Sequence, residues 1–334
     1  MENVLDVFKS DQFSMRSMVA AINKLPKKPG KISSLGIFQS EGVNTRAVGL
    51  EEINGAITLV QTSLPGAPGR TIAEGERVER SLNTVHIKAT AGLLAEKIAG
   101  VKAYGSQTQL ETFGALVTRK LQDLNNSLDA TLEYHMAGAL QGVVKDADGT
   151  TILDLCSALG LGSAPDAPDF VLGTDSTAVD KLVIDVKRRV EDACGNDTVE
   201  RIMCYASPEW FDKFVAHPAV QWAFQAQNEN SFGRADVRSG FVYKDVMFAE
   251  YRDRVGGKPL IAAGDARFFP IGPSLYNIYY SPADYIETVN TMGLPRYAKQ
   301  KVMDFDRGIE IEAQTNPLVI CRRPRALIRA YSSN

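Results

Sequence analysis

Two short stretches of the sequence carry residue types that could do chemistry. Gly160–Leu161–Gly162 begins like a dinucleotide-binding turn, but the third glycine of that motif is missing. Asp146–Ala147–Asp148–Gly149 resembles the start of a calcium loop, although Ser157 stands where the loop requires a glutamate at its twelfth position. A hairpin turn explains this second stretch fully. We therefore expect neither a nucleotide site nor a calcium site.

The histidines and cysteines do not form a recognisable catalytic or metal-binding set. The chain has His86, His135 and His217, together with Cys156, Cys194, Cys204 and Cys321. No two cysteines have the C-x-x-C spacing of a zinc site, and three histidines are too few to complete one. Phosphate-loop, H-E-x-x-H and G-x-S-x-G motifs are also missing. We expect no cofactor, no metal and no enzyme activity, although the scattered carboxylates leave an acid–base pair open.

Two groups of charged residues remain as candidate contact sites. The first mixes both signs: Arg70, Glu74, Glu76, Arg77, Glu79 and Arg80. The second is basic: Arg322, Arg323, Arg325 and Arg329. The basic group could contact phosphate or DNA, or could form salt bridges to an acidic neighbour such as the glutamates of the first group. We favour salt bridges because the whole chain carries a net charge of −3.

Composition narrows the class of protein. The chain has 334 residues, of which 44% are apolar, which is enough for one large core or two ordinary ones. The N-terminus lacks the basic and apolar regions of a signal peptide, and no apolar run approaches the roughly 20 residues that span a bilayer. We therefore expect a soluble protein made in a cytoplasm, with no membrane contact.

The first third of the chain contains segments that should not fold alone. Residues 1–42 are predicted to be an extended arm with one short helix, from Asp11 to Lys24. Residues 43–91 alternate in a period-two pattern around the turn-forming sequence PGAPG, which predicts a long two-stranded ribbon. The mixed charges of the first group lie in the middle of this ribbon. Because an isolated ribbon is only marginally stable, we expect it to lie on another surface.

Residues 106–142 predict a single, very long helix. Their apolar residues recur at steps of three and four, without proline, over a length of roughly 50 Å. A short helix is expected before it, at 92–104, and a hairpin around Asp148–Gly149 after it. The arm, the ribbon and this helix each leave surface that only a neighbouring subunit could bury. We therefore expect an assembly.

Residues 156–302 alternate strand-like and helix-like segments, which predicts an α+β domain with its own core. Helices are expected at 175–193 and 207–227, and strands at 169–173, 201–207, 240–252, 258–264 and 275–283. The β-rich residues 303–334 are expected to return and pair with an earlier part of the fold.

Three longer stretches carry a resemblance to a known family. AAGDARFFPIGPSLYNIYYSPADYIETVNTMGLPRYAKQ (262–300) and DFDRGIEIEAQTNPLVICRRPRALI (304–328) closely resemble the major capsid protein E family of lambda-type tailed phages. SFGRADVRSGFVYKDVMFAEYRDRVGG (231–257) matches the family's aromatic strand and its Glu250–Tyr251–Arg252 signature. The family's usual glycine pair in this strand is replaced here by Tyr243–Lys244–Asp245.

The resemblance implies the Hong Kong 97 capsid fold, an α+β architecture. On that basis, residues 1–42 would be the N-terminal arm, 43–91 the extended loop, 92–155 with 303–334 the peripheral domain, and 156–302 the axial domain. The helix at 106–142 would be the spine of the peripheral domain. The ribbon charges become candidates for inter-subunit contacts, and the C-terminal arginines become a possible inter-subunit or interior cluster.

The resemblance also implies a function and partners. Copies would form hexamers and pentamers that close into the icosahedral head shell, enclosing double-stranded DNA without sequence-specific binding. A separate scaffold protein and a portal would be partners, and a decoration protein is a further candidate. Assembly would take place in the host cytoplasm, and the finished protein would be located in the virion. No lysine–asparagine pair stands out, so cross-linking is not predicted. An encapsulin-type nanocompartment shell and an ordinary soluble enzyme are the alternatives.

Overall fold

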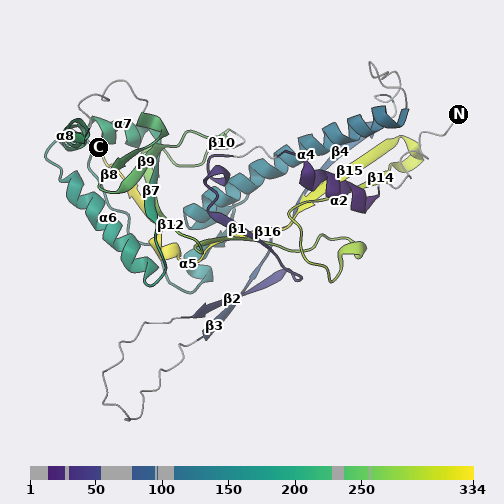
Figure 1. Cartoon of the computed structure of the whole chain (residues 1–334), viewed down its shortest axis with the longest axis horizontal. Coiled ribbons are helices and arrows are strands. Elements are labelled where there is room, and N and C mark those ends of the chain that lie inside the picture. The colour runs from purple at the N-terminus through teal and green to yellow at the C-terminus, as the bar shows by residue number, and fades with distance from the viewer. Residues whose placement is uncertain are drawn as a thin grey trace, which may run out of the picture.

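The computed structural model gives an elongated molecule with a sheet at each end and a third between them (Figure 1). It describes residues 14–26, 30–53, 77–94, 96, 109–227, 237–255 and 257–334. The α-helices in these residues are α2 (Met15–Lys24), α4 (Gln109–Leu140), α5 (Leu155–Ala158), α6 (Val179–Cys194), α7 (Pro208–Ala216) and α8 (Pro218–Gln227). Short 3₁₀ helices are η2 (Ser33–Leu35), η3 (Val237–Ser239), η4 (Ile286–Thr288), η5 (Asp304–Asp306) and η6 (Pro324–Ala326).

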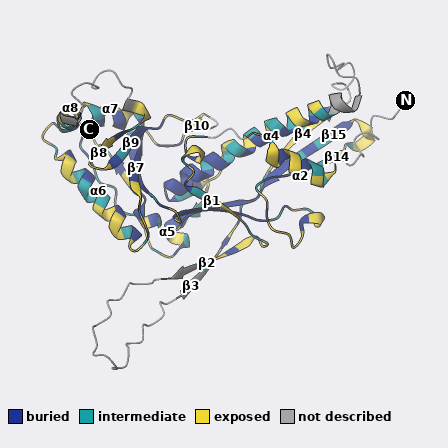
Figure 2. Ribbon diagram, viewed as in Figure 1, coloured by how far each residue is buried: buried dark blue, intermediate teal, exposed yellow. Residues whose placement is uncertain are grey.

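The long helix α4 crosses from one end of the molecule towards its middle. It has 32 residues and contains no proline. Its outer half packs against a sheet of three antiparallel strands, in the order β14 (Tyr297–Val302), β15 (Gly308–Thr315) and β4 (Ile87–Leu94). The core between them includes Leu121, Leu124 and Leu128 of the helix, and Figure 2 shows this buried stripe along α4. The predicted helix is confirmed, but it ends at Leu140 because Gly142 adopts a left-handed φ of 82° before the next strand.

The N-terminal arm is fastened to α4 through its own short helices. α2 starts after Ser14, whose hydroxyl accepts a hydrogen bond from the backbone of Ser17, and it ends before Pro26 as predicted. Farther along the arm, the buried carboxylate of Glu133 on α4 accepts backbone hydrogen bonds from Ile32 and Ser33, at 2.7 and 3.1 Å. The carboxylate thereby caps the start of η2.

The middle sheet joins the two ends of the molecule. Its strands are β1 (Phe38–Gly42), β13 (Tyr276–Tyr280) and β16 (Pro317–Cys321). β1 pairs with β13 in parallel, whereas β16 pairs with β13 in the antiparallel sense. The arm therefore supplies a strand to the centre of the fold.

The other end of the molecule is a five-stranded sheet covered by α6, α7 and α8. Its order is β17 (Ile328–Tyr331), β12 (Asp265–Ile271), β7 (Arg201–Ala206), β9 (Val246–Glu250) and β8 (Phe241–Tyr243). Stacked aromatic side chains form its core, with Trp210, Phe214 and Phe248 all completely buried. This is the separate core that the alternating pattern predicted.

The residues that replace the family's glycine pair form the turn of the β8–β9 hairpin. Its two turn residues, Lys244 and Asp245, both adopt a left-handed φ, of 50° and 66°. A two-residue hairpin of this kind favours glycine or asparagine, because other side chains are strained there. The ammonium of Lys187 lies 2.6 Å from the Asp245 carboxylate and so attaches the strained turn to α6.

Two predicted elements of this end differ in the structure. The expected helix at 207–227 is two helices, α7 and α8, which are separated at His217. Pro218 has no N–H to donate and disfavours helical backbone at the preceding residue, and His217 accordingly has ψ of 132°. The expected strand at 169–173 is an irregular segment with one bridge, from Asp169 to Tyr331. Of 258–264, only β11 (Lys258–Pro259) is strand, paired with β10 (Arg254–Val255).

Strand pairing also crosses the expected domain boundaries. Residues 303–334 do not return to the peripheral domain alone, because β15, β16 and β17 join three different sheets. β14, which was expected in the axial domain, pairs with β15 beside α4. These exchanges arise because β-strands choose partners by long-range packing, which a local pattern does not encode.

Two hairpins complete the described chain. The ribbon consists of β2 (Ala47–Ile53) and β3 (Arg77–Asn83), paired antiparallel as predicted. Residues 87–91, at the end of the expected ribbon, instead belong to β4, which pairs with β15, so the paired ribbon ends earlier in the sequence than expected. The hairpin around Asp148–Gly149 is confirmed as β5 (Val143–Lys145) and β6 (Thr151–Asp154). The expected helix at 92–104 falls partly on β4 and otherwise mostly outside the described residues. None of the described helices is both long and apolar enough to cross a membrane.

Candidate functional site at the root of the ribbon

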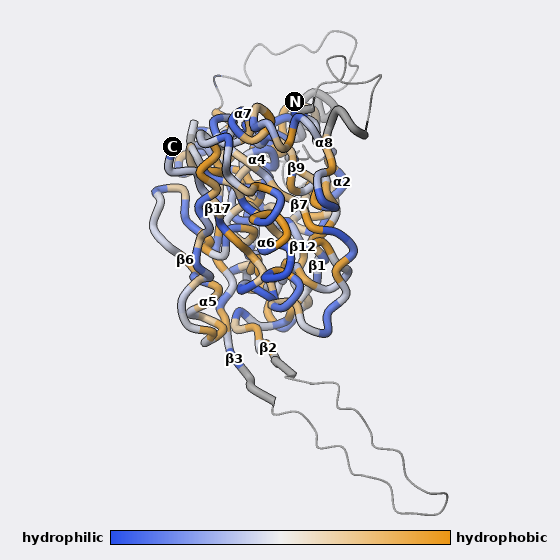
Figure 3. Tube along the Cα trace, turned by 90° about the vertical axis from the view of Figure 1, so that its left-hand side faces the viewer, coloured by the Kyte–Doolittle hydropathy of each residue, from blue (hydrophilic) through white to orange (hydrophobic). Residues whose placement is uncertain are grey.

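The ribbon joins the rest of the molecule, which we call the body, at a narrow root formed by residues 47–50 and 80–83. Figures 1 and 3 show β2 and β3 projecting together from one side of the molecule. Val48 and Leu82 face each other across the two strands and are buried in the central core. Their neighbours Ala47, Gly49 and Ser81 are exposed. This apolar pair, with the partly buried Leu50 beside it, anchors the described part of the ribbon in the core.

The predicted ribbon charges lie partly on β3. Arg70, Glu74 and Glu76 are outside the described residues, whereas Arg77, Glu79 and Arg80 belong to the paired strand rather than to an unpaired middle. Arg80 stands opposite Leu50 of β2, midway along the described pairs of the ribbon. It is the member of this group whose side chain the structure places.

The C-terminal arginines separate into different environments. Arg323 forms an ion pair with Asp197, with 2.6 Å between Nε and the carboxylate, and Arg329 holds both oxygens of Asp265 at 2.8 and 2.9 Å. These two partners belong to the body rather than to the ribbon, whose glutamates we had expected. Arg325 is exposed on η6.

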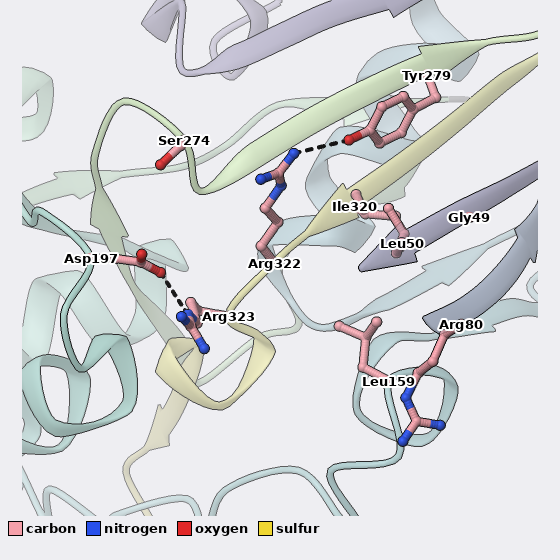
Figure 4. Close-up of a pocket in the computed structure, with 10 residues that line it drawn as sticks. All are labelled: Gly49, Leu50, Arg80, Leu159, Asp197, Ser274, Tyr279, Ile320, Arg322 and Arg323. Atoms are coloured by element: carbon pink, nitrogen blue, oxygen red, sulfur yellow. Dashed lines mark hydrogen bonds and ion pairs between the residues drawn. The ribbon is translucent and has the colours of Figure 1, made fainter. Parts of the chain in front are cut away.

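Arg80 and Arg322, which are distant in the sequence, line the same cleft. The cleft has a volume of about 480 Å³ and lies between the ribbon root, the middle sheet and the loops of the body (Figure 4). Aliphatic side chains form part of its wall. The lining residues are Gly49, Leu50, Arg80, Leu159, Asp197, Ser274, Tyr279, Ile320, Arg322 and Arg323.

The three arginines of the cleft point in different directions. In Figure 4, Arg322 is turned towards Tyr279, with 3.1 Å between Nη2 and the phenolic oxygen, and Arg323 towards Asp197. The guanidinium of Arg80 lies against Gly160, where an added methyl group would be only 2.3 Å from its Nη2 atom. Gly160 also has a left-handed φ of 63°. The glycine that we rejected as part of a nucleotide motif thus makes room for an arginine.

The cleft retains positive charge that the chain does not neutralise. It contains three arginines and one aspartate. Within the described part of the chain, neither Arg80 nor Arg322 forms an ion pair, since the aspartate is taken by Arg323. The Nε atom of Arg80 is buried and has no hydrogen-bond partner among these residues. Buried donors are normally satisfied, so this atom marks an incomplete environment.

A second charged cluster, inside the molecule, was not foreseen. Arg296, which precedes β14, is 2.6 Å from Asp129 of α4, and their side chains are only 4% and 9% exposed. Arg296 also donates to Asn125 and Thr315. The cluster ties the long helix to its sheet. A contact between residues this far apart leaves no signal in local sequence spacing.

The cysteines and histidines described below, whose side chains are of types that can do chemistry, occupy structural positions. The four cysteines are buried, and burial raises the pKa of Cys194 to about 11 and that of Cys321 to about 12. His217 accepts a hydrogen bond from the backbone of Ala219 at the start of α8. His135 is buried on α4, and desolvation lowers its pKa. In the described ranges, no three histidine, cysteine or acidic residues are grouped as metal ligands.

Comparison with known proteins assigns the chain to a family. The family profile described as phage major capsid protein E matches residues 14–332. The chain belongs to this family. The major capsid protein of Pseudomonas phage KPP10 is 26% identical over 347 residues, covering 97% of this chain and 98% of the relative. That of Salmonella phage Felix O1 is 22% identical over 356 residues, covering 96% of each.

The fold is also found in a solved capsid structure. The crystal structure of the putative capsid protein of an Escherichia coli CFT073 prophage superposes with a TM-score of 0.56. It is 13% identical and covers 96% of this chain and 99% of the other. This capsid protein therefore has the α+β Hong Kong 97 fold that the resemblance implied. It is a structural protein of the tailed-phage virion, it forms the head shell, and it is not an enzyme; the family assignment favours this role over the encapsulin alternative.

Proposed function

We propose that copies of this capsid protein form hexamers and pentamers that close into an icosahedral shell, with the ribbon of each copy lying across its neighbour. The observation that supports this most directly is the narrow ribbon root, where Val48 and Leu82 are the buried pair. A two-stranded ribbon with so little core is marginal in water, and a neighbouring surface would stabilise it.

The rest of the molecule supports a mechanical role in the wall of the shell. α4, its sheet and the arm are tied together by Glu133 and by the buried pair of Asp129 and Arg296, which makes that end of the body one connected unit. The ribbon charges, including Arg77 and Arg80, would make exposed ion pairs worth ~0–1 kcal/mol each. Weak contacts of this size let a misplaced subunit dissociate before the shell closes.

The proposed partners follow from the same role. A separate scaffold protein would control shell size, a portal would occupy one vertex, and a decoration protein could cover the outside, with assembly in the host cytoplasm. The shell would enclose double-stranded DNA without sequence-specific contact. The net charge of −3 supports this, because an acidic chain lacks the electrostatic attraction of a DNA-binding protein.

The experiment is to express the protein alone and to examine the soluble fraction by negative-stain electron microscopy and light scattering. We expect shells, tubes, or rings of five and six subunits. A uniform monomer or dimer would call for co-expression with the neighbouring genes, which would supply a scaffold. If that co-expressed protein still remained a monomer or dimer, the proposal would be wrong.

A further inference from the structure

The cleft at the ribbon root has the properties of a surface that forms one side of a contact. Two of its guanidinium groups, on Arg80 and Arg322, have no ion-pair partner among the described residues, and the buried Nε atom of Arg80 has no acceptor. The buried Nε atom of Arg80 has lost its hydration without gaining an acceptor, which is unfavourable. An acceptor from outside the chain would remove this cost.

The shape and lining of the cleft indicate the chemical class of that acceptor. Guanidinium groups bind carboxylates and phosphates with charge-assisted hydrogen bonds. Here the charges stand beside the aliphatic side chains of Leu50, Leu159 and Ile320, in a cleft of about 480 Å³. An aspartate or glutamate side chain has both a carboxylate and an apolar stem. It therefore matches a cleft that combines positive charge with aliphatic walls better than a bare phosphate does.

The position of the cleft indicates which molecule supplies the carboxylate. One wall is the root of the ribbon, formed by Gly49, Leu50 and Arg80, where the two strands bury few apolar side chains. The whole chain is acidic, so other copies offer many carboxylates, while DNA would be repelled by the net charge of −3. In a shell, the surface packed beside each ribbon root belongs to another copy.

We propose that this cleft binds acidic side chains, aspartate or glutamate, of a second copy of the chain, through Arg80 on one wall and Arg322 on the other. The contact rests on the proposed shell function, and it explains why the positive charge is left open in the single chain. Arg323 keeps its own partner, Asp197, and forms the fixed rim of the cleft.

A zero-length cross-link tests the contact directly. Arg322→Lys places a primary amine in the cleft, and a carbodiimide then joins that amine to a touching carboxylate as an amide, with loss of water. Shells are assembled from an equal mixture of unlabelled and ¹⁵N-labelled protein and digested for mass spectrometry. Arg325→Lys is the matched control, because residue 325 is exposed nearby but does not line the cleft.

We expect peptides that link position 322 to an aspartate or glutamate of a copy with the other label, and no such peptides from position 325. The mixed-label form should equal the two single-label forms together, as random mixing of copies requires. The identity of the linked carboxylate then names the partner segment. If Arg322→Lys does not assemble, Arg80→Lys places the amine on the opposite wall.

Intact shells whose cleft lysine links only to Asp197 of its own chain, or forms no link, would overturn the proposal while leaving the shell function in place. The same result is expected if the cleft faces packaged DNA. If both cleft variants remain folded capsomers while Arg325→Lys forms shells, the cleft guanidiniums are needed for the contact. If the parent protein itself forms no shells, the shell function fails and the inference fails with it.

Discussion

Two oppositely charged side chains are buried between α4 and the sheet beside it. Asp129 and Arg296 form a pair whose side chains are almost entirely inside the molecule, and Asn125 supports the arginine from the same helix. Taking two charges out of water is costly, and their attraction repays that cost only while both partners are present. The stability of the peripheral end therefore depends on the integrity of the pair.

Asp129→Ala should destabilise the unassembled chain by about 3–5 kcal/mol, because it leaves the Arg296 guanidinium buried without its counter-charge. Urea unfolding followed by circular dichroism measures the change. Asp123→Ala is the control, since that aspartate is exposed on the same helix and its loss should change stability by less than ~0.5 kcal/mol. Asp129→Leu combined with Arg296→Met should lose less than either change alone, and a larger loss would contradict the pairing argument.

His135 makes a separate contribution that depends on pH. Burial lowers its pKa from the ordinary value of 6.5, although the carboxylate of Asp146 opposes part of this shift. The folded chain therefore favours the neutral ring. Its contribution to stability is fully present above pH ~6.5 and is lost as pH falls through the lowered pKa, because the unfolded chain binds the proton more readily.

His135→Met should therefore flatten the pH dependence of unfolding. Between pH 8 and pH 5, the parent should lose up to ~1.4 kcal/mol more than the variant for each unit by which the pKa is lowered. The measurement is the urea midpoint of both proteins at several pH values. Identical pH profiles would show that protonation of this ring is not linked to folding.

At the scale of elements, the direction of the ribbon depends on a small number of contacts at its root. Val48 and Leu82 bury the strands, and the guanidinium of Arg80 rests on Gly160 in the loop after α5. A methyl group at 160 would occupy the space of the guanidinium, so the flexible Arg80 side chain would have to move away. The loop thus determines where the arginine lies.

Gly160→Ala and Gly162→Ala form a matched pair that isolates this contact. Both positions have a left-handed φ, of 63° and 80°, so both variants should lose about 1 kcal/mol of stability. Only the methyl group at 160 meets Arg80, since nothing lies within 4 Å of the one at 162. We expect assembly, measured by light scattering, to be impaired in Gly160→Ala and close to normal in Gly162→Ala. Equal assembly of the two would remove Gly160 from the ribbon root.

The sequence predicted the helices and hairpins well, but it predicted poorly which remote strands and side chains contact one another. The spacing of apolar residues predicted α4, and turn residues predicted the ribbon and the β5–β6 hairpin, because these depend on neighbours along the chain. The proline at 218 carried a local signal for the helix break that the apolar pattern obscured. Arg80 and Arg322 come from remote parts of the chain to line one cleft, and no local spacing encodes this. The capsid fold itself was predicted from the resemblance of residues 231–328 rather than from periodicity.

At the scale of the whole molecule, the ribbon and the charged cleft are the surfaces that we propose meet neighbouring copies. Charge reversal of Arg77 and Arg80 to glutamate should give soluble capsomers or aberrant shells, because the ribbon would then repel the carboxylates it is proposed to meet. Negative-stain microscopy distinguishes these products. Arg188→Glu is the control, since Arg188 is exposed on α6 and its ion pair is with Asp185 of the same helix. Normal shells from the ribbon variant would contradict the proposed role of these charges.

The distribution of the last strands has a consequence for synthesis on the ribosome. β15, β16 and β17, at 308–331, each complete a different sheet, and β16 also closes the sheet to which the arm contributes β1. Translation at roughly 5–20 residues per second leaves earlier strands waiting many seconds for these partners. A polypeptide released before residue 308 would lack a strand in all three sheets at once. We therefore expect such incomplete chains to fail to fold and to be left out of the shell.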